Sequence, residues 1–474
     1  MADRRVRLGW GTYAKWVSWL CTRSTAKREN EMRFGRGNGM NFDQSKCLQQ
    51  KSHALIPGGC HTYAKGDDQY PELAPAFLAR GQGCRVWDVD GNQFIEYGMG
   101  LRAVTLGHAY RPVVDAAHRQ MLLGINFTRP APIEVECAET LLRLVDGSRM
   151  AKFAKNGSDV TTAAVKLARA HTGRDKVAIC ADHPFFSVDD WFIGSTEMSS
   201  GIPSAIQRLT VKFRFNDLSS IQALFDRHPG QIACLIMEPE RTEPPAHNFL
   251  HAAQQICHKY GALFILDEII TGFRLYLGGA QQRYDVVPDL STFGKAMGNG
   301  FAISALVGKK EIMELGGLYH DRERVFLLST TYGAENHALA ATIETMSIYE
   351  RENVVEYLYR QGERLASGIV RAVAEHHLNG YFGVNGPPSN LIYFTRDQHQ
   401  KPSQPFRTLF LQEMLRRGII APSLVVSFSH RDEDIDRTIE AAAESLAVYR
   451  KALDEGIERY LVGRPVRPVT RRFN

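Results

Sequence analysis

The chain has 474 residues, of which 44% are hydrophobic and 23% charged, so a globular protein of two or three domains is expected. No apolar run reaches the roughly 18 residues that cross a bilayer, and a membrane protein is therefore not expected. The net charge of +5 would suit nucleic-acid binding, but residues 1–39 alone hold nine Lys/Arg and three acids, which leaves the rest of the chain near neutral. Nucleic acid is therefore not an expected partner.

The basic N-terminal segment is predicted to be a flexible extension over residues 1–45. An alternative is a membrane-surface or targeting helix, because aromatic and aliphatic side chains between Trp10 and Leu20 could share one helical face. Another is that the protein begins at Met32 or Met40.

The eight cysteines are widely spaced, with no CxxC pair and no Cys/His cluster of zinc type. A chain of this length needs no disulfide bonds to fold. We therefore expect reduced thiols, no metal site and a cytoplasmic location.

The first predicted element is a β-hairpin over 83–97, with Asp90-Gly91-Asn92 as its turn. A helix is predicted over 132–145. From about residue 150 short apolar strands alternate with amphipathic helices, which indicates a mostly parallel sheet covered by helices on both faces. The strands are predicted at 176–180, 207–211, 232–237, 262–266 and 302–307, and the helices at 159–171, 217–228, 249–260 and 334–350.

A smaller α/β unit is predicted towards the C-terminus. It has helices at 354–376, 404–417 and 432–455, and strands at 390–395 and 425–428. The predicted division is an N-terminal part of the small domain at 46–105, a large domain at 106–345 and the remainder of the small domain at 346–474.

Asn156-Gly157-Ser158-Asp159 follows a short apolar stretch and opens a predicted helix. The N–H groups at a helix N-terminus attract anions, and Gly157 would let a phosphate approach closely. The alternative is an ordinary polar cap on the helix.

Asp267 directly follows the predicted strand at 262–266, at the edge where open parallel sheets bind ligands. Lys295 follows in an apolar, glycine-rich turn, where desolvation would favour the neutral amine that Schiff-base formation requires. A carboxylate that keeps a pyridine nitrogen protonated turns the ring into an electron sink. Each residue alone is weak evidence, but the pair indicates a pyridoxal-phosphate enzyme.

With these motifs the chain resembles the class III aminotransferases, and within them the glutamate-1-semialdehyde 2,1-aminomutases. Other segments also match, namely Ile56-Pro-Gly-Gly59, Trp87-Asp-Val-Asp-Gly91, Leu106-Gly-His108, Thr271-Gly-Phe-Arg274, Leu277-Gly-Gly-Ala-Gln281 and Ala421-Pro-Ser423. The resemblance implies a fold-type I α/β subunit, pyridoxal 5′-phosphate as cofactor, and a homodimer with active sites shared between subunits.

The matched positions imply a role for each residue. Lys295 would form the Schiff base and move protons, while Asp267 would pair with the pyridinium nitrogen. The phosphate would lie on Asn156, Gly157 and Ser158, with Thr331 reaching it from the partner subunit. Phe185 and Ile269 would lie on opposite faces of the cofactor ring.

The chain departs from the aminomutases where they bind substrate. Lys65 stands in place of their carboxylate-binding arginine, and Arg102 is a new cation near the pocket. Arginine and lysine are not equivalent at a bidentate carboxylate site. These two residues are the candidate substrate ligands.

We therefore predict an aminotransferase that moves an amino group from a small donor to a carbonyl acceptor. One alternative is an aminomutase, which the paired glycines Gly278-Gly279 favour as part of a lid. A non-catalytic binding protein of the same fold is the remaining alternative.

Overall fold

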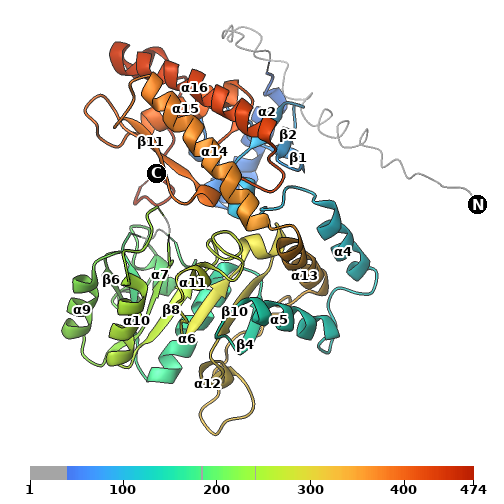
Figure 1. Cartoon of the computed structure of the whole chain (residues 1–474), viewed down its shortest axis with the longest axis vertical. Coiled ribbons are helices and arrows are strands. Elements are labelled where there is room, and N and C mark those ends of the chain that lie inside the picture. The colour runs from blue at the N-terminus through green and yellow to red at the C-terminus, as the bar shows by residue number, and fades with distance from the viewer. Residues whose placement is uncertain (1–39, 183–184, 241, 474) are drawn as a thin grey trace, which may run out of the picture.

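The protein is described by a computed structural model covering residues 40–182, 185–240 and 242–473 (Figure 1). Residues 1–39 of the predicted 1–45 extension lie outside the described residues, whereas its last three residues begin the helix α2 (Asp43–Leu55). Within them, no helix is both long and apolar enough to span a membrane.

A seven-stranded sheet forms the larger body, in the order β4-β10-β9-β8-β7-β5-β6. β10 runs antiparallel to β4 and β9, and the other pairs are parallel. The strands are β4 Met150–Ala154, β5 Lys176–Cys180, β6 Thr210–Phe213, β7 Ile232–Met237, β8 Leu263–Asp267, β9 Leu290–Phe293 and β10 Ser304–Gly308.

Alternate side chains of the central strands enter two separate hydrophobic clusters. Ile236 and Ile265 pack with α6 (Gly157–Thr172) on one face of the sheet. Leu235 and Phe264 pack with the helices on the other face, α9 (Leu218–Arg227) and α10 (Phe249–Lys259). Both faces are thus covered, which explains why β7 and β8 are continuous apolar runs.

Further helices flank this layer (Figure 1). α5 packs beside β4, and α13 packs against α4 and α5. Their bounds, with those of the shorter helices, are α4 Arg111–Met121, α5 Pro132–Leu144, α7 Asp190–Ile193, α8 Ser204–Gln207, α11 Ala280–Arg283, η4 Lys295–Gly298, α12 Lys310–Met313, η5 Glu314–Gly316 and α13 Asn336–Arg351.

The smaller body combines segments from both ends of the described chain. Its sheet has the order β1-β2-β3-β13, in which β13 (Ile419–Ile420) pairs in parallel with β3 (Gln93–Glu96). β2 (Arg85–Asp88) and β3 form the predicted hairpin. The remaining N-terminal elements are α2 Asp43–Leu55, η1 Pro57–Gly59, η2 Tyr63–Lys65, η3 Asp67–Gln69, β1 Leu78–Gln82 and α3 Met99–Arg102.

Three long helices cover the C-terminal part of this body, above the large sheet in Figure 1. They are α14 Val354–Glu375, α15 Gln404–Arg416 and α16 Asp432–Glu455. A two-stranded sheet and two short helices complete it, with β11 Phe382–Asn385, η6 Pro388–Asn390, β12 Ile392–Thr395 and η7 Ile457–Arg459.

The predicted strand at 425–428 is wrong. Val425 and Val426 are fully buried, but the segment joins no strand ladder: the Val425 N–H donates to the Tyr97 carbonyl, and the Phe428 N–H donates to that of Thr105. An apolar run can fill a core without joining a ladder. The strand predicted at 207–211 is displaced to Thr210–Phe213, because α8 extends to Gln207.

Gly362 on α14 lets η6 lie directly against the helix, since a Cβ at Gly362 would be 1.8 Å from the Pro388 carbonyl oxygen. Gly362→Ala should therefore lower stability by about 1–3 kcal/mol through overpacking, although alanine is normally the better helix former. Thermal unfolding would measure the loss. Ser367→Ala, at an exposed position of the same helix, should change little. Equal stability of wild type and Gly362→Ala would contradict this packing.

Candidate active site

The carboxyl ends of three adjacent parallel strands carry charged side chains. Glu238 follows β7, Asp267 ends β8, and Lys295 lies two residues beyond β9. Both carboxylates act electrostatically on Lys295 and oppose the lowering of its pKa. The structure thus brings the predicted Lys295–Asp267 pair together. Glu238 was missed, although it also directly follows a buried strand.

Asp267 is held in one orientation and keeps one oxygen for a ligand. Its Oδ1 accepts hydrogen bonds from the Thr292 hydroxyl at 2.9 Å and the Ile269 N–H at 3.0 Å. No donor to Oδ2 is found among the described residues. Burial raises the pKa of Asp267 to about 6, against the lowering effects of these hydrogen bonds and of Lys295. A cationic ring N–H at Oδ2 would stabilise the charged form of this carboxylate.

The adjacent Glu268 carboxylate is used to hold the fold together. One of its oxygens accepts from the Gln281 N–H at 2.7 Å, and the other from the Ala280 N–H at 2.9 Å and the Thr271 hydroxyl. Both oxygens are therefore committed to the fold. Of these two neighbours, only Asp267 is suited to bind a ligand.

Lys295 occupies a left-handed backbone conformation, with φ +43°, at the start of η4. Such strain in a residue other than glycine is concentrated at functional sites. Burial lowers the pKa of the Lys295 amine, and the positive charges of Arg102 and Arg274 lower it further. A lowered pKa increases the neutral, nucleophilic fraction of a lysine.

The predicted anion site lies at the N-terminus of α6. Asn156 is the N-cap residue, and the Asp159 carboxylate accepts from its N–H at 2.9 Å. The N–H groups of Gly157 and Ser158 open the helix, and no acceptor for them is found in the described part of the chain. The Ser158 hydroxyl accepts from the Val188 N–H at 3.0 Å and keeps its own proton to donate.

Gly157 links this helix terminus to the Asp267 strand end. A Cβ at Gly157 would lie 2.5 Å from Cδ1 of Ile269, a largely buried residue two positions after Asp267. Any other residue at 157 would displace Ile269. Because Gly157 has no side chain, the N-terminus of α6 and the strand end that carries Asp267 can lie close together.

These groups fit pyridoxal phosphate. The α6 N–H groups suit its phosphate, the free oxygen of Asp267 suits its ring nitrogen, and the Lys295 amine suits its aldehyde. The fit rests on uncommitted donors and acceptors together with the space that Gly157 leaves.

The remaining predicted cofactor residues lie in two segments. Phe185 is half exposed and meets Phe192 edge-on at 5.7 Å, whereas Phe186 is buried. Thr331 is exposed, and its carbonyl accepts from the Asn126 side chain at 2.9 Å.

Arg102 is the last residue of α3. All four residues of this short element, Met99 to Arg102, have positive φ values between +43° and +71°, so it forms a left-handed turn. Each residue other than glycine costs roughly 1–2 kcal/mol in this conformation. The Arg102 Nε–H donates to the Asn390 side chain at 2.8 Å. Lys65, in contrast, lies exposed in η2, and no hydrogen bond or ion pair among the described residues joins it to this site.

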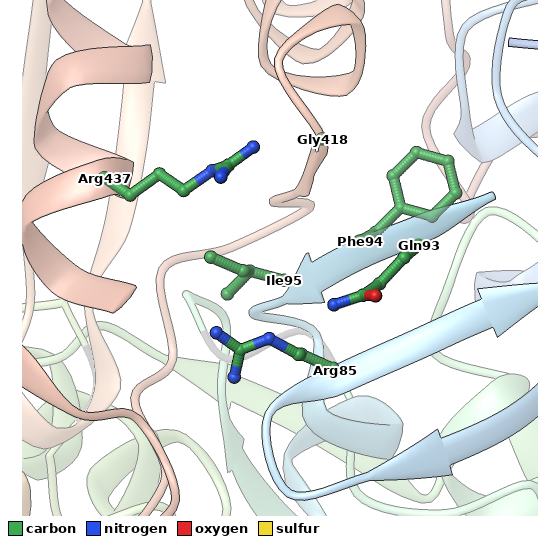
Figure 2. A pocket seen from close by; sticks show the side chains of 6 residues that line it. All are labelled: Arg85, Gln93, Phe94, Ile95, Gly418 and Arg437. Atoms are coloured by element: carbon green, nitrogen blue, oxygen red, sulfur yellow. The ribbon is translucent and has the colours of Figure 1, made fainter. Parts of the chain in front are cut away.

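A cavity of about 310 Å³ on the small sheet is separate from this site (Figure 2). Its lining residues are Arg85, Gln93, Phe94, Ile95, Gly418 and Arg437, none of which is a predicted cofactor residue. The Arg85 guanidinium is paired with Asp434 at 2.5 Å. We assign no chemistry to this cavity.

Comparison with known proteins supports the same chemistry. The sequence profile of the family "Aminotransferase class-III" matches residues 67–381. The chain belongs to the class III aminotransferases. A glutamate-1-semialdehyde 2,1-aminomutase of Geotalea daltonii is 32% identical over 433 residues, covering 86% of this chain and 99% of the relative. A 3-aminobutyryl-CoA aminotransferase of Cloacimonas acidaminovorans is 31% identical over 420 residues, covering 86% and 98%.

Among solved structures, the FumI protein of Sphingopyxis sp. MTA144, in its PLP internal aldimine form, superposes on this class III aminotransferase with a TM-score of 0.79. It is 28% identical and covers 87% of this chain and 97% of its own. The predicted family, fold and enzyme class are thereby confirmed. Pyridoxal 5′-phosphate is confirmed as the cofactor.

Proposed function

We propose that this class III aminotransferase moves an amino group between two separate small molecules, at least one of which carries a carboxylate. The observation behind this proposal is the placement of Arg102, a cation that acts electrostatically on Lys295 and is held by Asn390. A guanidinium beside the reacting centre favours an anionic substrate, because Arg–carboxylate pairs are strong and directional.

Lys295 and Asp267 carry the chemistry in this proposal. The bound cofactor supplies an electron-withdrawing ring that stabilises negative charge on the substrate carbon. Lys295 would hold the cofactor covalently, and its amine would move the proton at the substrate carbon that bears nitrogen. Asp267, fixed by Thr292 and Ile269, keeps the ring nitrogen protonated.

The other residues orient the cofactor. Gly157 and Ser158 bind the phosphate at the α6 N-terminus, where Asn156 is the cap. Phe185 and Ile269 would contact opposite faces of the ring. Phe185 suits this role because its ring is half exposed and can meet a ligand. The ring of the neighbouring Phe186 is buried in the hydrophobic core.

We also propose a homodimer in which Thr331 of one subunit reaches the phosphate of the other. The support is a group of exposed apolar side chains around Thr331, since such groups mark protein interfaces. The Asn126–Thr331 hydrogen bond holds two exposed segments together, and their exposed side chains are Leu122, Leu123, Phe127 and Tyr332.

An aminomutase is the second candidate function, favoured by the 32% identity to the Geotalea daltonii enzyme. The paired glycines, which suggested a lid, have another explanation. A Cβ at Gly278 would lie 2.3 Å from the Leu144 carbonyl oxygen, and one at Gly279 would lie 2.8 Å from the Glu268 carboxylate. Close packing therefore accounts for both, and they no longer favour the aminomutase.

The two candidates differ in what they do with glutamate-1-semialdehyde. We expect weak or no conversion to 5-aminolevulinate, because Lys65 replaces the aminomutases' arginine and lies exposed in η2. The same preparation should release an oxo acid when mixed with an amino acid donor alone. Product analysis of both reactions tests this. Formation of 5-aminolevulinate with kcat/KM above about 10⁴ M⁻¹s⁻¹, in the ordinary enzyme range, would make it an aminomutase.

A further inference from the structure

Arg274 is fully buried, yet it forms no ion pair with a carboxylate in the described part of the chain. It lies in the segment that follows β8, seven residues beyond Asp267. Burial lowers the pKa of the Arg274 guanidinium to about 10, so it remains charged at neutral pH. A buried charge of this kind is costly unless its hydrogen bonds are satisfied, and its partners therefore indicate what it does.

Those partners are oxygens that surround Arg102. Nη2 of Arg274 donates to the Arg102 carbonyl at 2.7 Å and to the Thr105 hydroxyl at 3.0 Å. Nη1 donates to the Ser389 carbonyl at 3.2 Å. The guanidinium thus joins the end of the left-handed turn to η6.

η6 also holds the side chain of Arg102. Asn390, next to Ser389, accepts from the Arg102 Nε–H at 2.8 Å. Arg102 is therefore fixed at its backbone by Arg274 and at its side chain by Asn390. η6 itself lies against α14, where Gly362 permits the close approach.

The turn requires such support, because it strains three residues other than glycine. Met99, Leu101 and Arg102 all have positive φ. Gly100 is also needed in the turn, since a Cβ there would lie 2.9 Å from Val104 Cγ2. A strained segment persists only where its surroundings hold it, and segments of this kind are concentrated at ligand sites.

We infer that Arg274 is a positioning residue that, together with Asn390, holds Arg102 against the substrate carboxylate and so sets the preference for acidic over neutral substrates. This inference rests on the proposed function, in which Arg102 binds that carboxylate. It adds that the preference depends on two residues that act through Arg102. Losing either support should reduce the preference while Arg102 itself is still present.

The test uses the holoenzyme and matched carbonyl acceptors of three, four and five carbons, each as the ω-oxo acid and as the plain aldehyde. The measured quantity is the ratio of kcat/KM for acid over aldehyde. Arg102→Leu should lower this ratio roughly 10- to 100-fold, mainly through KM for the acid, as expected for losing a charged hydrogen bond. Asn390→Ala and Arg274→Lys should each lower it on the order of 10-fold.

A purely structural role would give a different pattern. Loss of packing would lower kcat/KM for acid and aldehyde alike. In the Arg102→Leu background, Asn390→Ala and Arg274→Lys should leave the remaining ratio unchanged, because they act through Arg102. Asn390→Ala keeps the inference testable should Arg274→Lys fail to fold. Arg364→Lys, at an exposed site on α14, is the control and should match wild type.

The outcomes separate the two proposals. An unchanged ratio in Arg102→Leu, or no preference for acid in the wild type, overturns the proposed carboxylate role of Arg102. A ratio that collapses in Arg102→Leu but is unchanged in Asn390→Ala and Arg274→Lys overturns only the positioning inference. Equal losses for acid and aldehyde in the latter two variants also overturn it.

Discussion

Lys295→Ala is expected to lower turnover by about 10⁴-fold, the upper end for removing a group that transfers protons. We expect no substitute among the described residues, because Lys295 is the lysine on which both Asp267 and Glu238 act electrostatically. Steady-state transamination assays would measure the loss. Thermal unfolding would show whether the variant is folded.

Lys451→Ala is the matched control for this variant. Lys451 lies exposed on α16, and its loss should leave turnover unchanged. Turnover of Lys295→Ala within tenfold of wild type would mean that another lysine holds the cofactor.

Asp267→Asn is expected to lower turnover by about 10²-fold or more while cofactor remains bound. The amide cannot supply the negative charge that keeps a pyridine nitrogen protonated, although it can still accept from Thr292 and Ile269. Turnover and cofactor content should be measured on the same preparation. Near-normal turnover would mean that a group other than Asp267 pairs with the ring nitrogen of the cofactor.

Glu268→Gln provides the comparison, because both Glu268 oxygens are committed to the fold. Its main effect should be a lower unfolding temperature, since an amide nitrogen cannot accept from the Ala280 or Gln281 N–H. A larger loss of turnover in Glu268→Gln than in Asp267→Asn would exchange the roles of the two carboxylates.

Much of the fold could be predicted because its strands and helices have distinct apolar patterns. β5 and β7 have the predicted bounds of 176–180 and 232–237, since fully buried parallel strands are continuous apolar runs. The same reasoning misplaced a strand at 425–428, where the apolar run fills the core. Short strands such as β13, which has two residues, offer too little pattern to detect.

The site residues that could be predicted are those recognised by their place at the end of a strand or the start of a helix. Asp267 at a strand end and Gly157 at a helix start are local features. The left-handed turn was not predictable, because three of its four residues are not glycine. The role of Arg274 depends on Arg102 and Ser389, which lie 172 and 115 residues away in the chain. The domain limits and the residue roles remain predictions.

The attachment of the cofactor to Lys295 is the central claim, and borohydride reduction of the native holoenzyme tests it most directly. Reduction fixes the cofactor to its lysine, and peptide mapping by mass spectrometry then identifies that residue. We predict one labelled peptide, containing Lys295, and loss of the visible absorption band of the lysine-bound cofactor. Label on a peptide without Lys295, or no stable label, would contradict the proposed active site.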